Sequence, residues 1–256
     1  MSLPLYGSKA FREASGDTLR PGGLKLTAYG LDLMRKAGLP EGASVLDCGC
    51  GPGATAACVA EQGYRAWGVD WHPGPFALGG AAGTGEENAE ATLVCGDILS
   101  LPFCDGAFDA CLAECVLSLT ADLGKALRDI FRVLAPGGLF LVTDLTLRRG
   151  TAVPPDGPFM ERGQSCMAGA LTFPGWEEAL AGAGFDVIFH EDVSHALAQF
   201  AARLVWYDAA GELGCLLPGG QCSPGGVKCF GYGMFLDRKA VCGALYPFLD
   251  SAVTFS

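Results

Sequence analysis

The chain has 256 residues, half of them hydrophobic and 18% charged, which is typical of a globular protein with a full core. Its net charge of −11, with only 17 Lys and Arg residues, argues against a nucleic-acid partner, because phosphate backbones are bound by clustered cations. No apolar run reaches the roughly 20 residues needed to cross a bilayer, and no signal peptide is visible, so we expect a cytoplasmic protein.

Strand and helix patterns alternate along the first 150 residues. Apolar residues at helical spacing predict a helix over 24–36, and short apolar segments predict strands at 43–46, 64–69, 91–95, 108–112 and 139–143. Pro136 and the two glycines after it predict a turn just before the last of these strands. Such alternation is typical of right-handed crossovers and a doubly wound parallel sheet.

The second half continues the same pattern with longer connections. It predicts a helix over 176–183, a strand over 185–193, an amphipathic helix over 194–210 and a last strand over 228–236. We therefore expect a single domain over 1–256, divided into a lead-in with its helix (1–40), a cofactor-binding core (41–148), a C-terminal half (149–239) with an insertion (194–227), and a tail (240–256).

A glycine-rich turn follows the first predicted strand. Gly49, Gly51 and Gly53 separate this strand from a helix, with Asp47 just ahead of them. Glycine allows a tight turn and lets a ligand touch the backbone, and the N-terminus of the following helix favours a carboxylate or phosphate. A glycine run alone does not identify the ligand.

Acidic residues stand at or just past the ends of four predicted strands: Asp47, Asp70, Asp97 and Glu114. Open parallel sheets bind ligands at these carboxyl ends. Asp70 lies 19 residues beyond Gly51, a spacing suited to binding ribose hydroxyls. The pattern indicates a nucleotide-like cofactor.

An ordered set of motifs carries a more specific resemblance: Val45–Gly53, Val69–Asp70, Gly96–Ile98, Phe108–Asp109 and Arg132–Leu139. Together they resemble the class I S-adenosylmethionine-dependent methyltransferases of the methyltransferase type 11 superfamily, over about residues 24–145. The resemblance implies a Rossmann-like sheet of seven strands, mostly parallel with an antiparallel last strand and helices on both faces. It also implies S-adenosyl-L-methionine as the cofactor.

The same resemblance assigns cofactor-binding roles. The backbone of Gly49, Cys50, Gly51 and Gly53 would face the methionine portion, Asp47 would orient this turn, and Arg20 would reach the cofactor carboxylate. The remaining contacts would come from the later strand ends: Asp70 to the ribose, Trp71 beside the adenine or ribose, Asp97 and the Ile98 amide to the adenine edge, and Ala113 and Glu114 beside the sulfonium.

The acceptor of the methyl group is expected to be a small molecule, but neither its identity nor the oligomeric state follows from the sequence. A general base is needed only if the acceptor holds its proton at neutral pH. Glu114 and His72 are the candidates for this role, although Glu114 can equally be a cofactor-shell or surface carboxylate.

Twelve cysteines without an export signal are expected to be reduced thiols. Cys215, Cys222 and Cys229 recur every seven residues and could hold a soft ion or metalloid, but no CxxC pair is present and packing also explains Cys229. A non-catalytic thiol or metal-binding protein on this fold therefore stays an alternative.

A nicotinamide-dependent oxidoreductase is another alternative, because Gly49, Gly51 and Ala54 also fit the dinucleotide-binding pattern G-x-G-x-x-A. The acid at Asp47 ahead of the glycines and the Gly96-Asp97 pair argue against it.

Overall fold

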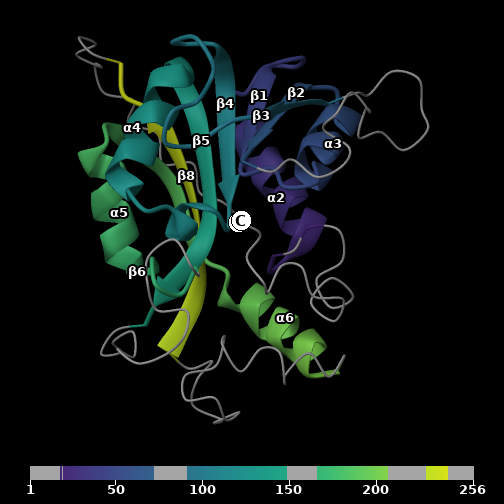
Figure 1. Cartoon of the computed structure of the whole chain (residues 1–256), viewed down its shortest axis with the longest axis vertical. Helices are drawn as coiled ribbons and strands as arrows, with labels where there is room; N and C mark the ends of the chain where they lie inside the picture. Colours follow the sequence, from purple (N-terminus) through teal and green to yellow (C-terminus); the bar gives the residue numbers. More distant parts are fainter. Residues whose placement is uncertain (1–17, 19, 72–90, 149–165, 207–228, 242–256) are drawn as a thin grey trace.

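One sheet organises the chain in the computed structural model, which describes residues 18, 20–71, 91–148, 166–206 and 229–241 (Figure 1). The strand order is β3-β2-β1-β4-β5-β8-β7. The strands are β1 Ser44–Cys48, β2 Arg65–Asp70, β3 Thr92–Cys95, β4 Phe108–Glu114, β5 Leu134–Leu147, β7 Phe185–Asp192 and β8 Phe230–Lys239. A two-residue strand, β6 (Leu171–Thr172), pairs with the end of β5.

The strand directions confirm the predicted architecture. The first five strands, β1 to β5, run parallel, and β8 runs antiparallel to both of its neighbours, β5 and β7. The chain moves outward from β1 to β3 and then returns to β4 on the other side of β1. The point where this order reverses, between β1 and β4, is where open α/β sheets bind ligands.

Helices cover both faces of the sheet (Figure 1). One face carries α2 (Gly23–Lys36) and α3 (Ala54–Glu61), while α4 (Leu123–Val133) and α5 (Phe173–Gly182) cover the other. A further helix, α6 (Ser194–Trp206), contacts β8. The sequence predicted this helix as far as residue 210, but residues beyond 206 lie outside the described part of the chain.

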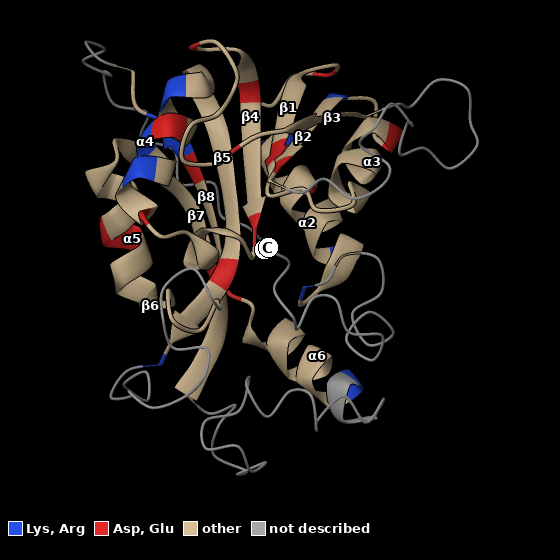
Figure 2. Ribbon diagram, in the orientation of Figure 1, with Lys and Arg blue, Asp and Glu red and all other residues tan. Residues whose placement is uncertain are grey.

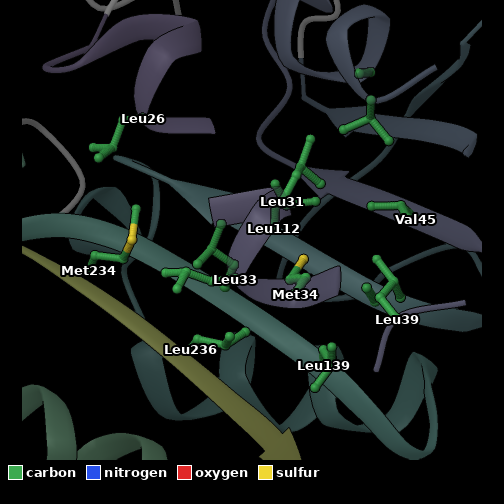
Figure 3. Close-up of a cluster of buried hydrophobic side chains, with 14 of the residues drawn as sticks. Leu26, Leu31, Leu33, Met34, Leu39, Val45, Leu112, Leu139, Met234 and Leu236 are labelled. Atoms are coloured by element: carbon green, nitrogen blue, oxygen red, sulfur yellow. The ribbon is translucent and has the colours of Figure 1, made fainter. Parts of the chain in front are cut away.

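Successive residues of the central strands point to opposite faces of the sheet and pack into two separate hydrophobic clusters, one on each face. Val45 and Leu112 point toward α2, where they pack with Leu31 and Met34 (Figure 3). Their neighbours along the strands, Leu46, Cys111 and Ala113, pack on the other face with α4 and α5. This period of two is the reason that both faces of the central strands are apolar.

Side-chain caps fix where two helices begin. Asp122 accepts the Lys125 amide at 2.9 Å ahead of α4, and Thr172 accepts the Gly175 amide at 3.1 Å ahead of α5. Because Thr172 is the cap and Pro174 lies in the first turn, α5 begins at Phe173, three residues before the predicted helix.

The predicted turn at Ala135–Gly138 is wrong as a boundary of β5. Phe108 pairs with Leu134 and Ala110 pairs with Leu139, so the single residue Asp109 faces four residues of β5. Gly137, at φ +76°, supports this bulge inside a strand that is much longer than the predicted 139–143. The strand extends because β8 pairs with it continuously from Leu139 to Leu147.

None of the helices in the described part of the chain combines the length and apolar character that crossing a bilayer requires.

Candidate functional site

The four predicted acids lie at the carboxyl ends of neighbouring strands. Figure 2 colours the acidic residues of the described part red. Asp70 and Glu114 are the last residues of β2 and β4, and Asp47 is the penultimate residue of β1, which lies between those strands. Asp97 follows β3 by two residues. Since these strands are parallel and adjacent, the carboxyl ends lie side by side around the switch point.

Gly49 holds the glycine turn against the sheet. The amides of Gly49 and Cys50 both donate to the Val69 carbonyl, at 2.7 and 3.1 Å. Gly49 has φ +79°, and a Cβ there would overlap Val116. The Cys50 side chain is buried against Gly68. These two residues therefore shape the turn through their packing and their bonds to β2.

Gly51 is the open side of the same turn. It has φ +50°, and no atom of the described residues lies within 4 Å of where a Cβ would stand. Its amide donates to Asp70 Oδ2 at 3.0 Å. Gly53, at φ +92°, then precedes α3 and has no side chain with which to cap it. A ligand can approach the backbone here and meet the N-terminus of a helix.

A buried ion pair lies beside this turn. Arg20 Nη2 is 2.5 Å from Glu114 Oε2, and it also bonds the hydroxyls of Thr27 at 2.6 Å and Thr55 at 2.8 Å. Arg20 Nη1 donates to the Gly23 carbonyl at 3.0 Å. The Arg20 side chain is 4% exposed, so the lead-in is anchored into the site by a fully enclosed charge.

Asp47 is a buried acid whose hydrogen bonding is incomplete. It is 3% exposed, and its Oδ2 has no hydrogen-bond partner among the described residues. Burial, reinforced by the charge of Glu114, raises the pKa of Asp47 to about 8, although Arg20 and the Ala56 amide act in the opposite direction. Asp47 therefore holds a proton at neutral pH in this state.

The remaining predicted contacts differ in how well they are placed. Trp71 is 64% exposed at the end of β2, and Asp97 Oδ1 accepts the Leu99 amide at 2.8 Å, which orders the turn after β3. Ile98 is half-buried against the second hydrophobic cluster. Ala113 is fully buried in that cluster, on the strand face opposite to Glu114, so its side chain does not line the site.

Three predicted residues fall outside the described part of the chain: His72, Cys215 and Cys222. The remaining thiol of the proposed cluster, Cys229, is half-buried against the first hydrophobic cluster. Among the residues that the structure describes, no group of three metal-ligating side chains comes together.

Sequence reasoning missed Thr27 and Thr55, which complete the Arg20 contacts. Both are polar residues on otherwise apolar helix faces and both are buried, and this interruption of the apolar pattern was the one available signal. It also missed the Cys115–Cys166 thiol pair next to Glu114, whose hydrogen bond, together with burial, raises the pKa of Cys115. Cys115 has φ +58°, which is uncommon outside glycine.

Residues 46–142 match the sequence model of a family described as "Methyltransferase domain". A malonyl-[acyl-carrier protein] O-methyltransferase from Serratia marcescens is 33% identical over 104 residues, which are 41% of this chain and 39% of that protein. The match therefore spans less than half the length of this curated relative.

Two solved structures are similar over most of the chain. The [4+2]-cyclase SpnF is 26% identical, with a TM-score of 0.62, over 85% of this chain and 81% of the other. A structure described as a sarcosine dimethylglycine methyltransferase, from Galdieria sulphuraria, has a TM-score of 0.65 at 18% identity, over 89% and 90% of the two chains, which shows the shared fold.

The motifs, the sheet order and these likenesses agree with one another. Residues 46–142 are therefore similar in sequence to a methyltransferase domain, and the order of the strands agrees with that likeness.

Proposed function

We propose that the protein transfers a methyl group from S-adenosylmethionine to a small-molecule acceptor. The observation that carries this proposal is that two buried groups, the Arg20 guanidinium and the Asp47 carboxyl oxygen without a described partner, lie beside the open backbone at Gly51. An amino acid carries one carboxylate and one ammonium, which fit these two groups. A buried polar atom without a partner is costly, so the Asp47 oxygen favours a ligand that can donate to it.

The nucleoside part of the cofactor would lie along the neighbouring strand ends. Asp70 would hold the ribose hydroxyls with Trp71 beside it, and Asp97 with the Ile98 amide would bind the adenine. The turn from Gly49 to Gly53 supports the methionine portion through the exposed backbone of Gly51. Ala113 contributes through its packing, which sets the end of β4 and hence Glu114.

The bound sulfonium supplies an electrophilic methyl group, and the protein aligns it with the acceptor and excludes water. Both oxygens of Glu114 already accept hydrogen bonds, from Arg20, Thr27 and Thr55. This favours a cofactor-shell role for Glu114 over proton abstraction. We assign no general base within the described residues.

The proposed organisation is one domain over 1–256 with a cofactor-binding core at 41–148. The acceptor would be selected by the lead-in with its helix (1–40) and by the insertion (194–227). The net charge of −11 argues against a nucleic-acid partner, and a cytoplasmic location is part of the proposal. The acceptor class stays open.

Calorimetric titration with S-adenosylmethionine and with NADH tests the cofactor. Binding of the first and silence of the second are expected, and the reverse result would contradict the proposal in favour of an oxidoreductase. If the reduced protein binds neither cofactor but takes up zinc stoichiometrically, the thiol or metal-binding alternative would be favoured.

Transfer itself needs a separate assay, because one of the similar folds is named a cyclase. Tritiated methyl transfer into a panel of thiols, metalloids, phenols and small carboxylates should label one class. Tight cofactor binding with no labelled acceptor, in this panel or in a total lysate, would count against a methyltransferase.

A further inference from the structure

Glu114, Thr27 and Thr55 enclose one nitrogen of Arg20. Nη2 carries two hydrogens, and all three residues place an acceptor within 2.8 Å of it. The two threonine hydroxyls in turn bond Glu114 Oε2, at 3.1 Å each. The guanidinium is therefore fixed by one nitrogen, and Nη1 is oriented further by the Gly23 carbonyl.

This network is assembled from four separate segments: the lead-in, α2, α3 and the end of β4. The network costs free energy, because both charges of the ion pair are removed from water. Apolar residues of similar volume often stabilise a fold as well as a buried ion pair does. Stability alone does not account for it. What it does provide is a guanidinium with a fixed orientation next to the glycine turn.

We infer that Glu114 is a positioning residue which, with the Thr27 and Thr55 hydroxyls, holds Arg20 so that its remaining N–H groups meet the carboxylate of the cofactor. In the described contacts Nη1 uses one of its two hydrogens, on the Gly23 carbonyl, so an Nη1 donor is left for a ligand. The inference rests on the proposed function, because it needs a cofactor with a carboxylate. It gives Glu114 a part in cofactor selection and none in proton transfer.

Two ligands that differ only in the carboxylate isolate this role: S-adenosylmethionine and decarboxylated S-adenosylmethionine. Wild-type protein should bind the first about tenfold or more tightly than the second, as expected for a charge-assisted contact. Glu114→Gln should reduce this preference to about threefold or less, with the affinity for the decarboxylated ligand changed by no more than about twofold. Calorimetry on the full chain measures all four affinities.

Thr55→Val provides a second variant, because it removes one contact to Arg20 Nη2 without leaving a buried charge unpaired. It should lower the preference about threefold even if Glu114→Gln fails to fold. Asp70→Ala is the matched control, since the ribose is common to both ligands and both affinities should fall alike. Thermal unfolding of each variant confirms that the protein is folded.

The outcomes separate the two proposals. If wild-type protein binds neither ligand, the proposed function fails and this inference fails with it. If wild-type protein prefers S-adenosylmethionine but folded Glu114→Gln and Thr55→Val keep or increase that preference, only the inference is overturned. Equal losses for both ligands would also overturn it, because Glu114 would then contact the ammonium or sulfonium directly.

Discussion

The Gly51 amide donates to Asp70 Oδ2 across 3.0 Å, which joins the end of β2 to the open side of the glycine turn. The bond holds the carboxylate beside the backbone position of the glycine turn that is open to a ligand. It couples the residue proposed for the ribose to the residue proposed for the methionine portion.

Asp70→Ala is expected to weaken S-adenosylmethionine binding by about 1–3 kcal/mol, the usual cost of losing a charged hydrogen-bond partner. Calorimetric titration of the folded variant measures this loss. An unchanged affinity would remove Asp70 from the cofactor site.

Gly51→Ala should abolish tight cofactor binding at little cost in stability. The new Cβ meets no atom of the part of the chain that the structure describes, so the free energy of unfolding should fall by only about 1–2 kcal/mol, from the left-handed backbone at φ +50°. The Cβ would instead occupy the space through which the ligand approaches.

Gly63→Ala is the matched control for this change, since Gly63 has φ +86°, equally open surroundings and a position at the far end of α3. Urea unfolding should show similar losses for both variants, and calorimetry should show lost affinity only for Gly51→Ala. Equal affinities would mean that the ligand does not approach Gly51.

Gly49→Ala should destabilise the fold by roughly 2–4 kcal/mol, because a Cβ there would overlap Val116 in addition to straining the backbone. The double variant Gly49→Ala/Val116→Ala should recover part of that loss, although Val116→Ala alone is destabilising. Strictly additive losses in urea unfolding would show that the two residues do not interact.

Asp47→Asn should flatten the pH dependence of stability. The pKa of Asp47 rises from 3.8 to about 8 on folding, so its contribution is complete below pH 4 and is lost as the pH rises through 8. Between these values the free energy of unfolding should fall in wild-type protein relative to Asp47→Asn. Urea unfolding from pH 5 to 8.5 measures the difference, and parallel curves would contradict it.

His190→Gln tests a second buried acid–base contact, far from the site. Burial alone would lower the pKa of His190, but its hydrogen bonds to Asp237 and Glu177, each 3.1 Å, outweigh burial and raise it. The contribution of His190 to stability is therefore complete below pH 6.5 and is lost as the pH rises through the folded-state value.

Wild-type protein should consequently lose more stability above pH 6.5 than His190→Gln does. His195→Gln is a suitable control, because the His195 side chain is exposed on α6. A His190→Gln curve that follows the wild-type curve would show that the contact does not favour the charged imidazole.

The sheet was predictable because its signals are local. Each strand is a short apolar segment ended by a turn, and parallel pairing then brings the acids at the strand ends together without further information. The bulge at Pro136 was not predictable, because it depends on pairing with β4 and β8 and not on the residues that form it.

The site was predictable only in part, for the same reason. Glu114 meets Arg20 across 94 positions in the chain, and no local pattern indicates such a contact. Ala113 stays a prediction for the site, although the alternation along β4 turns its side chain to the other face, into the second hydrophobic cluster. Because successive side chains of a strand point to opposite faces, the sequence of β4 already implies that the side chains of Ala113 and Glu114 lie on different faces of the sheet.

The position of β8 has a consequence for the growing chain. β7 is synthesised before β8, yet among the described strands it pairs with β8 alone, through which it reaches β5. During translation the parallel strands β1 to β5 can assemble first, whereas β7 has no place in the sheet until residue 239 has left the ribosome. Until then β5 is an unprotected edge, so a chain stopped ahead of Phe230 would present a long, apolar strand to other molecules and should aggregate.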